Sequence, residues 1–225
     1  MQFKLAQVCS FSYDVNRDYS SSDIPSLVGK LNNTQCTEEV HKHAADALAY
    51  IAFEDAGNQA EIVAAGAIIP IVDLLGSKSS GVQESAAGAL WYLIKDCTAN
   101  RVKFAAAGAI PALVSLLGPQ RSNGVISSAL LALYYLAENS SDNLVAEIVA
   151  AGAIPPLVAL LGPQSSTKVQ MNAAGALMKL ASLANNKLIR SAGGVLALRL
   201  LIQSTTDDRV RETATMAYGM VNIVA

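Results

Sequence analysis

The block AGAIIPIVDLLG begins at Ala65 and returns almost unchanged as AGAIPALVSLLG at Ala107 and AGAIPPLVALLG at Ala151. Two weaker copies are AGGVLALRLLIQ from Ala192 and IPSLVGKLN from Ile24. The glycines of the four fuller copies are separated by 42, 44 and 41 residues. Self-similarity at a period in this range indicates stacked repeats, and it decides the fold class before any single motif does.

Each block reads as a short amphipathic helix. Its apolar residues fall at i, i+3, i+4 and i+7, as at Ile110, Leu113, Val114 and Leu117. A proline in the first turn is compatible with a helix because the N–H it lacks has no partner there. A glycine follows the last apolar residue, and we expect left-handed C-caps at Gly76, Gly118 and Gly162.

A longer helix is predicted about 15 residues after the start of each block. Its apolar residues recur at i, i+4, i+7, i+8 and i+11, and all five copies fit one template. We number this helix from its first apolar residue, position 0, which is Val40, Val82, Val125, Val169 and Val210. A further short helical segment precedes each glycine block, as in NRVKFAAAG. Each repeat therefore reads as a short, a medium and a long helix, named H1, H2 and H3.

No such unit buries its apolar faces alone, so the units must stack. We predict an all-α, right-handed α-solenoid of about five three-helix repeats, with no sustained alternation of the kind that strands show. Residues 1–225 form one domain in this prediction. Residues 1–23 are an N-terminal remnant or cap, and the repeats cover about 24–56, 57–98, 99–141, 142–184 and 185–225.

These motifs resemble the armadillo repeat family. The resemblance rests on the AGAIP block with an asparagine upstream, at Asn58, Asn100 and Asn143, and on the AAGAL segments at Ala86–Leu90 and Ala173–Leu177. It covers residues 24 to 225, and the residues of these motifs look most like those of plant and algal members. HEAT repeats are the nearest alternative, but they are two-helix units without the AGAIP block. The resemblance implies a solenoid that binds proteins along a concave face lined by H3.

The two ends depart from the pattern. Lys30 stands where later H2 helices have leucine, and Arg199 replaces a valine, so we expect polar outer faces there. The sequence stops inside its last H3. We therefore expect either a longer array or an end covered by a partner, which includes self-association through an uncapped C-terminal end.

Composition excludes several classes of protein. The net charge is −2 and the pI about 5.7, so no basic excess exists for nucleic acid. The start has no secretory signal, and the three cysteines show no CxxC spacing, which favours reduced thiols in the cytoplasm or nucleus. The uncharged stretch 148–167 contains three prolines and a repeat junction, so we expect no membrane span.

The sequence offers no convincing catalytic, metal or cofactor site. His41 and His43 lie about 200° apart around a helix and cannot share a metal ion. The segment from Gly76 to Val82 begins like a phosphate-binding loop, but Val82 stands where that loop needs lysine. We therefore expect no enzyme activity, no cofactor and no bound metal.

The H3 helices carry the candidate binding residues. Positions +2, +6, +9 and +13 point away from the core at about 100° per residue, and +3 and +10 flank them. This face is apolar for a surface, which is typical of partner-binding grooves. The alternative is that these side chains are half-buried packing between repeats. The candidates are Tyr50, Trp91, Tyr92, Leu131, Tyr134, Tyr135, Met171 and Met178.

The predicted function is a protein–protein interaction scaffold whose partner is a protein or peptide with apolar anchors. Alternatives are an armadillo fragment of a U-box ubiquitin ligase or a nuclear-import adaptor. Importin-α-like members carry tryptophan at +6 and asparagine at +10 to hold basic peptides, and this sequence has neither in any repeat. The resemblance therefore favours general protein binding over recognition of a basic localisation signal.

Overall fold

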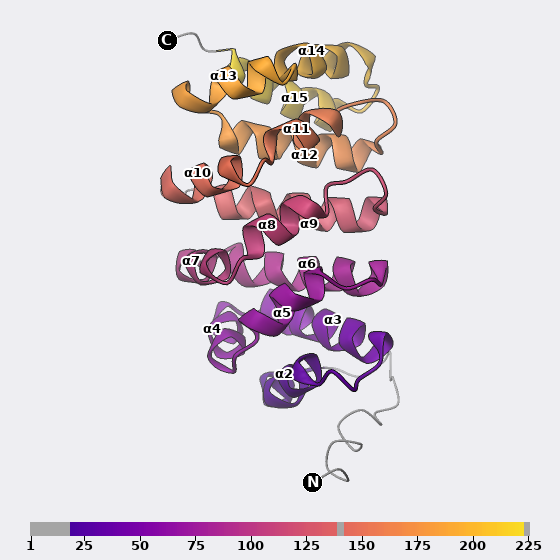
Figure 1. The fold of residues 1–225 in the computed structure, drawn as a ribbon, viewed down its shortest axis with the longest axis vertical. Coiled ribbons are helices and arrows are strands. Elements are labelled where there is room, and N and C mark those ends of the chain that lie inside the picture. Colours follow the sequence, from indigo (N-terminus) through magenta and orange to yellow (C-terminus); the bar gives the residue numbers. More distant parts are fainter. Residues whose placement is uncertain (1–18, 139–141, 223–225) are drawn as a thin grey trace. The chain divides into compact units, whose positions relative to one another are not determined.

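The computed structural model describes residues 19–138 and 142–222. The predicted N-terminal remnant, with Leu5 and Val8, lies outside these residues. Every regular element in the described part is helical, with no strand among them, as the sequence predicts. Contacts divide the chain into two compact units, Met1–Ala112 and Leu113–Ala225. Each unit is a stack of helical repeats, and most of them contain a short, a medium and a long helix (Figure 1).

The first unit contains two H3 helices packed against each other, α3 (Glu38–Glu54) and α6 (Ser80–Ile94). Its H2 helices pack on these H3 helices, and its H1 helices complete the repeats. In chain order the remaining elements are η1 (Ser21–Asp23), α2 (Ile24–Asn32), α4 (Ala56–Ala64), α5 (Ile68–Leu75) and α7 (Thr98–Ala106). The H2 helix α8 (Ala109–Ser115) spans the boundary between the units.

The second unit contains three H3 helices, α9 (Asn123–Ala137), α12 (Thr167–Leu180) and α15 (Asp208–Val221). Helix α12 packs against both α9 and α15, so its surface has an H3 neighbour on each side (Figure 1). The other helices of this unit are α10 (Asp142–Ala150), α11 (Ile154–Ala159), α13 (Leu183–Ser191) and α14 (Gly194–Ser204).

The predicted phase of H3 is confirmed by its buried residues. Val125, Ala129, Ala132, Leu133 and Leu136 occupy the core positions of α9, and all five are buried. The equivalent five positions of α12 are buried as well. Alanine at +4 and +7 leaves little side-chain bulk between neighbouring helices, so their backbones approach closely. The opposite face of each H3 is left as the exposed surface of the repeat.

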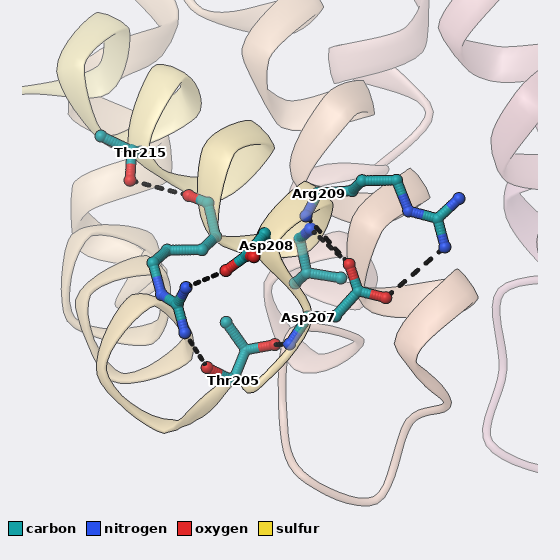
Figure 2. Close-up of polar contacts among 7 residues, drawn as sticks. Thr205, Asp207, Asp208, Arg209 and Thr215 are labelled. Atoms are coloured by element: carbon teal, nitrogen blue, oxygen red, sulfur yellow. Dashed lines mark hydrogen bonds and ion pairs between the residues drawn. The ribbon is translucent and has the colours of Figure 1, made fainter.

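A side-chain cap fixes the start of most H3 helices. The hydroxyls of Thr37, Ser122 and Ser166 accept hydrogen bonds from the backbone N–H at position 0 of α3, α9 and α12. The Asp207 carboxylate does the same for α15, accepting from Arg209 N at 2.9 Å and Val210 N at 3.3 Å (Figure 2). Each cap satisfies an N–H that has no partner within its helix.

The upstream asparagines of the repeat have a structural role. Asn58 Nδ2 donates to the Ile51 carbonyl at 2.9 Å, and Asn100 Nδ2 donates to the Leu93 carbonyl at 2.8 Å. Both carbonyls belong to position +11 of the preceding H3, near its C-terminal end. Asn185 makes the equivalent bond to Leu180 at 2.9 Å. The asparagine therefore ties the start of H1 to an unpaired carbonyl of H3.

The left-handed glycines are not the predicted ones. Positive φ angles occur at the glycines of the AGAI blocks, Gly66 (88°), Gly108 (86°), Gly152 (82°) and Gly193 (83°), where H1 turns into H2. Gly76, which follows H2, has φ −82°, and neither Gly118 nor Gly162 is among the left-handed residues. The predicted C-caps at these three glycines are wrong, because H2 ends in a tight turn such as Gly76 N to Asp73 O. At the H1 end, Ala67 N reaches back to Ile62 O, which requires the reversed backbone at Gly66.

Two expectations about the ends and the thiols need correction. Lys30 is buried at 6% exposure, so it does not form part of a solvated outer face, whereas Arg199 is exposed as expected. Cys36 is disulfide-bonded and Cys97 is a free thiol. The expectation of reduced thiols is therefore wrong for Cys36 and stays a prediction for Cys97.

No single helix in the described part of the chain is long and apolar enough to cross a membrane. One pair of helices, α4 and α5, reaches the required length and composition together, but it is bent by 88° at its junction.

Candidate peptide-binding surface

All eight predicted surface residues are at least partly exposed. Tyr50 is exposed, and the other seven have intermediate exposure, including Trp91 and Tyr134. Neither ring lies in the core between H2 and H3, which agrees with the predicted register. The residues fall into two groups, one on the H3 helices of each unit.

The group in the first unit is an aromatic cluster on α3 and α6. The ring centroids of Trp91 and Tyr92 lie 4.1 Å apart, and Phe53 meets Tyr92 edge-on at 5.6 Å. Phe53 is 61% exposed and was not among the predicted residues. It occupies position +13 of α3, which the helical register places on the outer face. Phe53 could therefore have been identified as a surface residue from the sequence. Lys95 Nζ lies 5.8 Å from the Phe53 centroid.

The group in the second unit lines a cavity. Five of the predicted residues, contributed by α9 and α12, surround a hollow of about 340 Å³: Leu131, Tyr134, Tyr135, Met171 and Met178. The rest of the lining comes from α12 and α15: Asn172, Gly175, Thr213 and Met216. None of these nine residues is charged. An apolar hollow with a few polar groups is typical of a ligand site.

Gly175 is the smallest residue that lines the cavity. It lies inside α12, and a Cβ atom built on it would be 3.5 Å from Tyr134 Cδ2. The absence of a side chain at this position therefore lets the Tyr134 ring lie close to the neighbouring helix. Gly175 occupies position +6 of its H3, at the centre of the outer face that the sequence predicts.

The rim of the cavity carries a compensated charge cluster. Lys179 Nζ lies 3.0 Å from Glu138 Oε1 and 4.9 Å from the centroid of the Tyr134 ring. The Tyr134 hydroxyl donates to the same Glu138 oxygen at 3.3 Å. Burial opposes the charged form of Lys179, but its bonds to Glu138 and Tyr134 outweigh this and raise the pKa of Lys179 above its ordinary value. The ammonium and the carboxylate thus largely neutralise each other.

The sequence missed four lining residues, namely Asn172, Gly175, Thr213 and Met216. Asn172 and Thr213 both occupy position +3, a flank of the predicted face. Gly175 and Met216 both occupy position +6, at its centre. All four positions were therefore recoverable from the register. Asn172, Gly175 and Thr213 are polar or small and do not suggest an apolar stripe, whereas Met216 is apolar and fits the stripe.

No group of three or more His, Cys, Asp or Glu side chains in residues 19–138 and 142–222 is placed to hold a metal ion. The two histidines near the N-terminus have other contacts. His41 Nε2 lies 3.1 Å from the Asn33 carbonyl oxygen, and His43 Nε2 is hydrogen-bonded to the Tyr19 hydroxyl.

The three-helix repeats and their exposed H3 surfaces define a repeat protein of the armadillo class. The model of the Armadillo/beta-catenin-like repeat matches residues 55–95 and 141–182. A computationally designed armadillo repeat protein for modular peptide recognition has a similar structure, with TM-score 0.81 and 29% identity over 97% of this chain and 91% of that chain. Residues 55–95 and 141–182 therefore match armadillo repeats, and the fold of the chain is similar to that of designed armadillo repeat proteins.

Two further solved structures are similar to this chain. A designed armadillo repeat protein in complex with the peptide (KR)4 has TM-score 0.79 and 28% identity over 98% of this chain and 91% of that chain. An engineered protein has TM-score 0.80 and 33% identity over 97% of this chain and 87% of that chain. No curated protein sequence matches the chain. These relatives are designed or engineered proteins, so the plant and algal likeness stays a prediction.

Proposed function

We propose that this chain is a protein-interaction module that binds a peptide on its H3 surfaces, with the cavity on α9, α12 and α15 as the anchor site. The observation that carries the proposal is the uncharged cavity of about 340 Å³, lined by two tyrosines and three methionines. Aromatic and methionine side chains offer large, adaptable contact areas and are typical of binding surfaces. The aromatic cluster on α3 and α6 supplies a second contact area of the same kind.

The relatives support peptide binding in general and not a particular ligand. One of them is designed for modular peptide recognition and another holds the peptide (KR)4. A basic side chain in the cavity of this chain would be buried among uncharged residues, and Glu138 at its rim is already paired with Lys179. An unpaired buried charge is costly, so apolar anchors are favoured over basic ones.

The proposal describes a binding role without catalysis. No observation on the described residues favours a ubiquitin ligase or a nuclear-import adaptor.

A selection of random 12-residue peptides against the intact chain tests this function. We expect enriched sequences with one or two Phe, Leu or Met residues and few Lys or Arg. Their binding should weaken by about 10- to 30-fold, or roughly 2 kcal/mol, in the Tyr134→Ala variant. Met220→Ala is the matched control, because Met220 is an exposed residue of α15 that does not line the cavity. Enrichment of Lys- and Arg-rich peptides whose binding ignores Tyr134→Ala would refute the proposal.

A further inference from the structure

One polar group in the cavity lacks a partner. Asn172, on α12, is only 9% exposed, and its Nδ2 has no hydrogen-bond partner within the described part of the chain. The residue lines the same cavity as Met171, Thr213 and Met216. Buried side-chain amides in folded proteins nearly always have a partner, so each exception needs an explanation.

The unpaired amide destabilises the free protein. A buried donor without an acceptor loses its bonds to water and receives nothing in exchange. Leucine has nearly the same shape and would fit apolar surroundings without this penalty. An amide at this position is explained if a bound ligand supplies the hydrogen-bond acceptor.

The charges around the cavity limit which chemical groups of a ligand can enter it. The nine lining residues are uncharged, and Lys179 and Glu138 at the rim are paired with each other. A charged anchor would therefore lose its hydration without gaining a counter-ion. The ligand part that enters must be apolar, and the atom that meets Asn172 must be an uncharged acceptor.

We propose that Asn172 is a specificity-determining residue that donates a hydrogen bond from Nδ2 to a carbonyl oxygen of a bound peptide whose uncharged apolar side chain fills the cavity. This inference rests on the proposed peptide-binding function. The carbonyl belongs either to the peptide main chain or to a Gln or Asn side chain, and the two sources share the same chemistry. Met171, Met178 and Met216 line the same cavity, and their unbranched side chains can adjust their rotamers to a bound ligand.

Methionine methyl NMR on the intact chain tests the contact with defined probes. The probes are acetylated and amidated peptides of sequence Gly-Ser-Ser-Phe-Gln-Ser-Gly, and the same peptide with Lys or Glu in place of Phe. We expect the Phe peptide to shift the Met171, Met178 and Met216 methyl signals and the Asn172 side-chain amide signals. The Met220 methyl should not move, and it is the internal control. The Lys and Glu peptides should bind at least tenfold more weakly.

The Asn172→Leu variant distinguishes a role of Asn172 in peptide binding from a purely structural role. It should raise the melting temperature by about 2–4 °C, because it removes an unpaired buried donor. The substitution should also weaken the affinity for the Phe peptide by about 3- to 10-fold. Loss of stability together with unchanged Phe-peptide affinity would overturn the inference. Two altered peptides then identify the acceptor: one has an ester in place of the amide after Phe, and the other has Leu in place of Gln. The change that removes the acceptor should weaken binding to the unsubstituted chain and should have no effect on binding to the Asn172→Leu variant.

The outcomes distinguish the two proposals. If the Phe peptide shifts the methyl signals and Asn172→Leu binds it equally well, the cavity remains the anchor site and the role of Asn172 is refuted. If none of the peptides shifts these signals, both proposals fail. If a free apolar compound such as toluene shifts the signals as strongly as the Phe peptide and Asn172→Leu binds both equally, the site is a non-specific apolar cavity, and the inference is again refuted.

Discussion

Lys179 on α12 lies with its Nζ 4.9 Å from the centroid of the Tyr134 ring on α9 and 3.0 Å from Glu138 Oε1. The contact joins two neighbouring H3 helices at the rim of the cavity. One turn earlier on the same helix as Lys179, Gly175 has no side chain, which leaves room for the Tyr134 ring. The position of Tyr134 therefore depends on residues that the apolar pattern alone does not reveal.

Lys179→Met keeps much of the aliphatic stem and removes the charge. Both partners of the ion pair are about one-quarter exposed, so we expect a loss of only about 0.2–1 kcal/mol in the free energy of unfolding at pH 7. Because the folded state raises the pKa of Lys179, the stabilisation is complete below its unfolded pKa and declines as pH rises through the higher folded pKa. Urea unfolding at pH 7 and at pH 11 should show a smaller difference between variant and unsubstituted chain at pH 11.

Lys168→Met is the control for this measurement, because Lys168 is an exposed lysine in the first turn of the same helix. We expect it to change the free energy of unfolding by less than about 0.5 kcal/mol. A loss equal to that of Lys179→Met would show that the contact with Tyr134 and Glu138 contributes nothing specific.

We expect a substitution at a left-handed glycine of the repeat to destabilise the fold more than the same substitution at a glycine without a left-handed backbone. Gly108→Ala forces a Cβ atom onto a backbone with φ 86°, which should cost about 1–2 kcal/mol although no atom crowds the site. Gly118→Ala places a methyl group in equally open space without the left-handed backbone, so its effect should stay within about 0.5 kcal/mol. Thermal unfolding of the two variants compares them directly, and equal melting temperatures would contradict this assignment.

The helical register was predictable because one face of each H3 repeats the same apolar residues. Valine at position 0 and alanine at +4 and +7 give the same phase in five copies, and the burial of Val125, Ala129 and Ala132 confirms it. That phase also placed Trp91 and Tyr134 on the exposed side. It places Phe53, at +13 of α3, on this side as well, but the contact between Phe53 and Tyr92 depends on how α3 packs against α6.

Other features depend on neighbours that the sequence does not identify. A glycine follows both H1 and H2, and only the geometry of the turn decides that Gly66 is left-handed and Gly76 is not. Lys30 is buried although a lysine in an end repeat favours exposure. The missing partner of Asn172 is visible only when all surrounding atoms are in place.

His43 gives the protein a predicted pH dependence. Burial, followed by the nearby Lys30 charge, lowers the pKa of His43 below its ordinary value of 6.5. The folded state therefore binds fewer protons than the unfolded state between these two pKa values. The stabilisation is complete above pH 6.5 and is lost as pH falls through the folded pKa. Melting temperatures between pH 7 and pH 5 should therefore fall less steeply for His43→Gln than for the unsubstituted chain.

His41→Gln is the control for this pH series, since it removes the other histidine of α3. Carboxylates titrate equally in all three proteins, so the difference between their slopes isolates His43. Parallel slopes for His43→Gln and the unsubstituted chain would show that protonation of His43 does not oppose folding.

Gly175→Ala tests whether a ligand contacts the cavity at Gly175. The added methyl group would lie 3.5 Å from Tyr134 Cδ2 and 3.9 Å from Thr213 Cγ2, which is ordinary van der Waals contact. Alanine also favours the helix interior over glycine by about 0.5–1 kcal/mol, so the variant should melt about 1–4 °C higher. Binding of the Phe peptide should nevertheless weaken by about 3- to 10-fold, because the methyl group occupies space that the anchor needs.

The matched control is Gly88→Ala, which changes the same position, +6, in helix α6 of the first unit. A Cβ atom there meets nothing within 4 Å, and Gly88 does not line the cavity. Gly88→Ala should therefore gain similar stability and leave the affinity for the Phe peptide unchanged. Because both variants gain stability, a weaker affinity confined to Gly175→Ala cannot arise from partial unfolding. Equal affinities in the two variants would place the bound side chain away from Gly175.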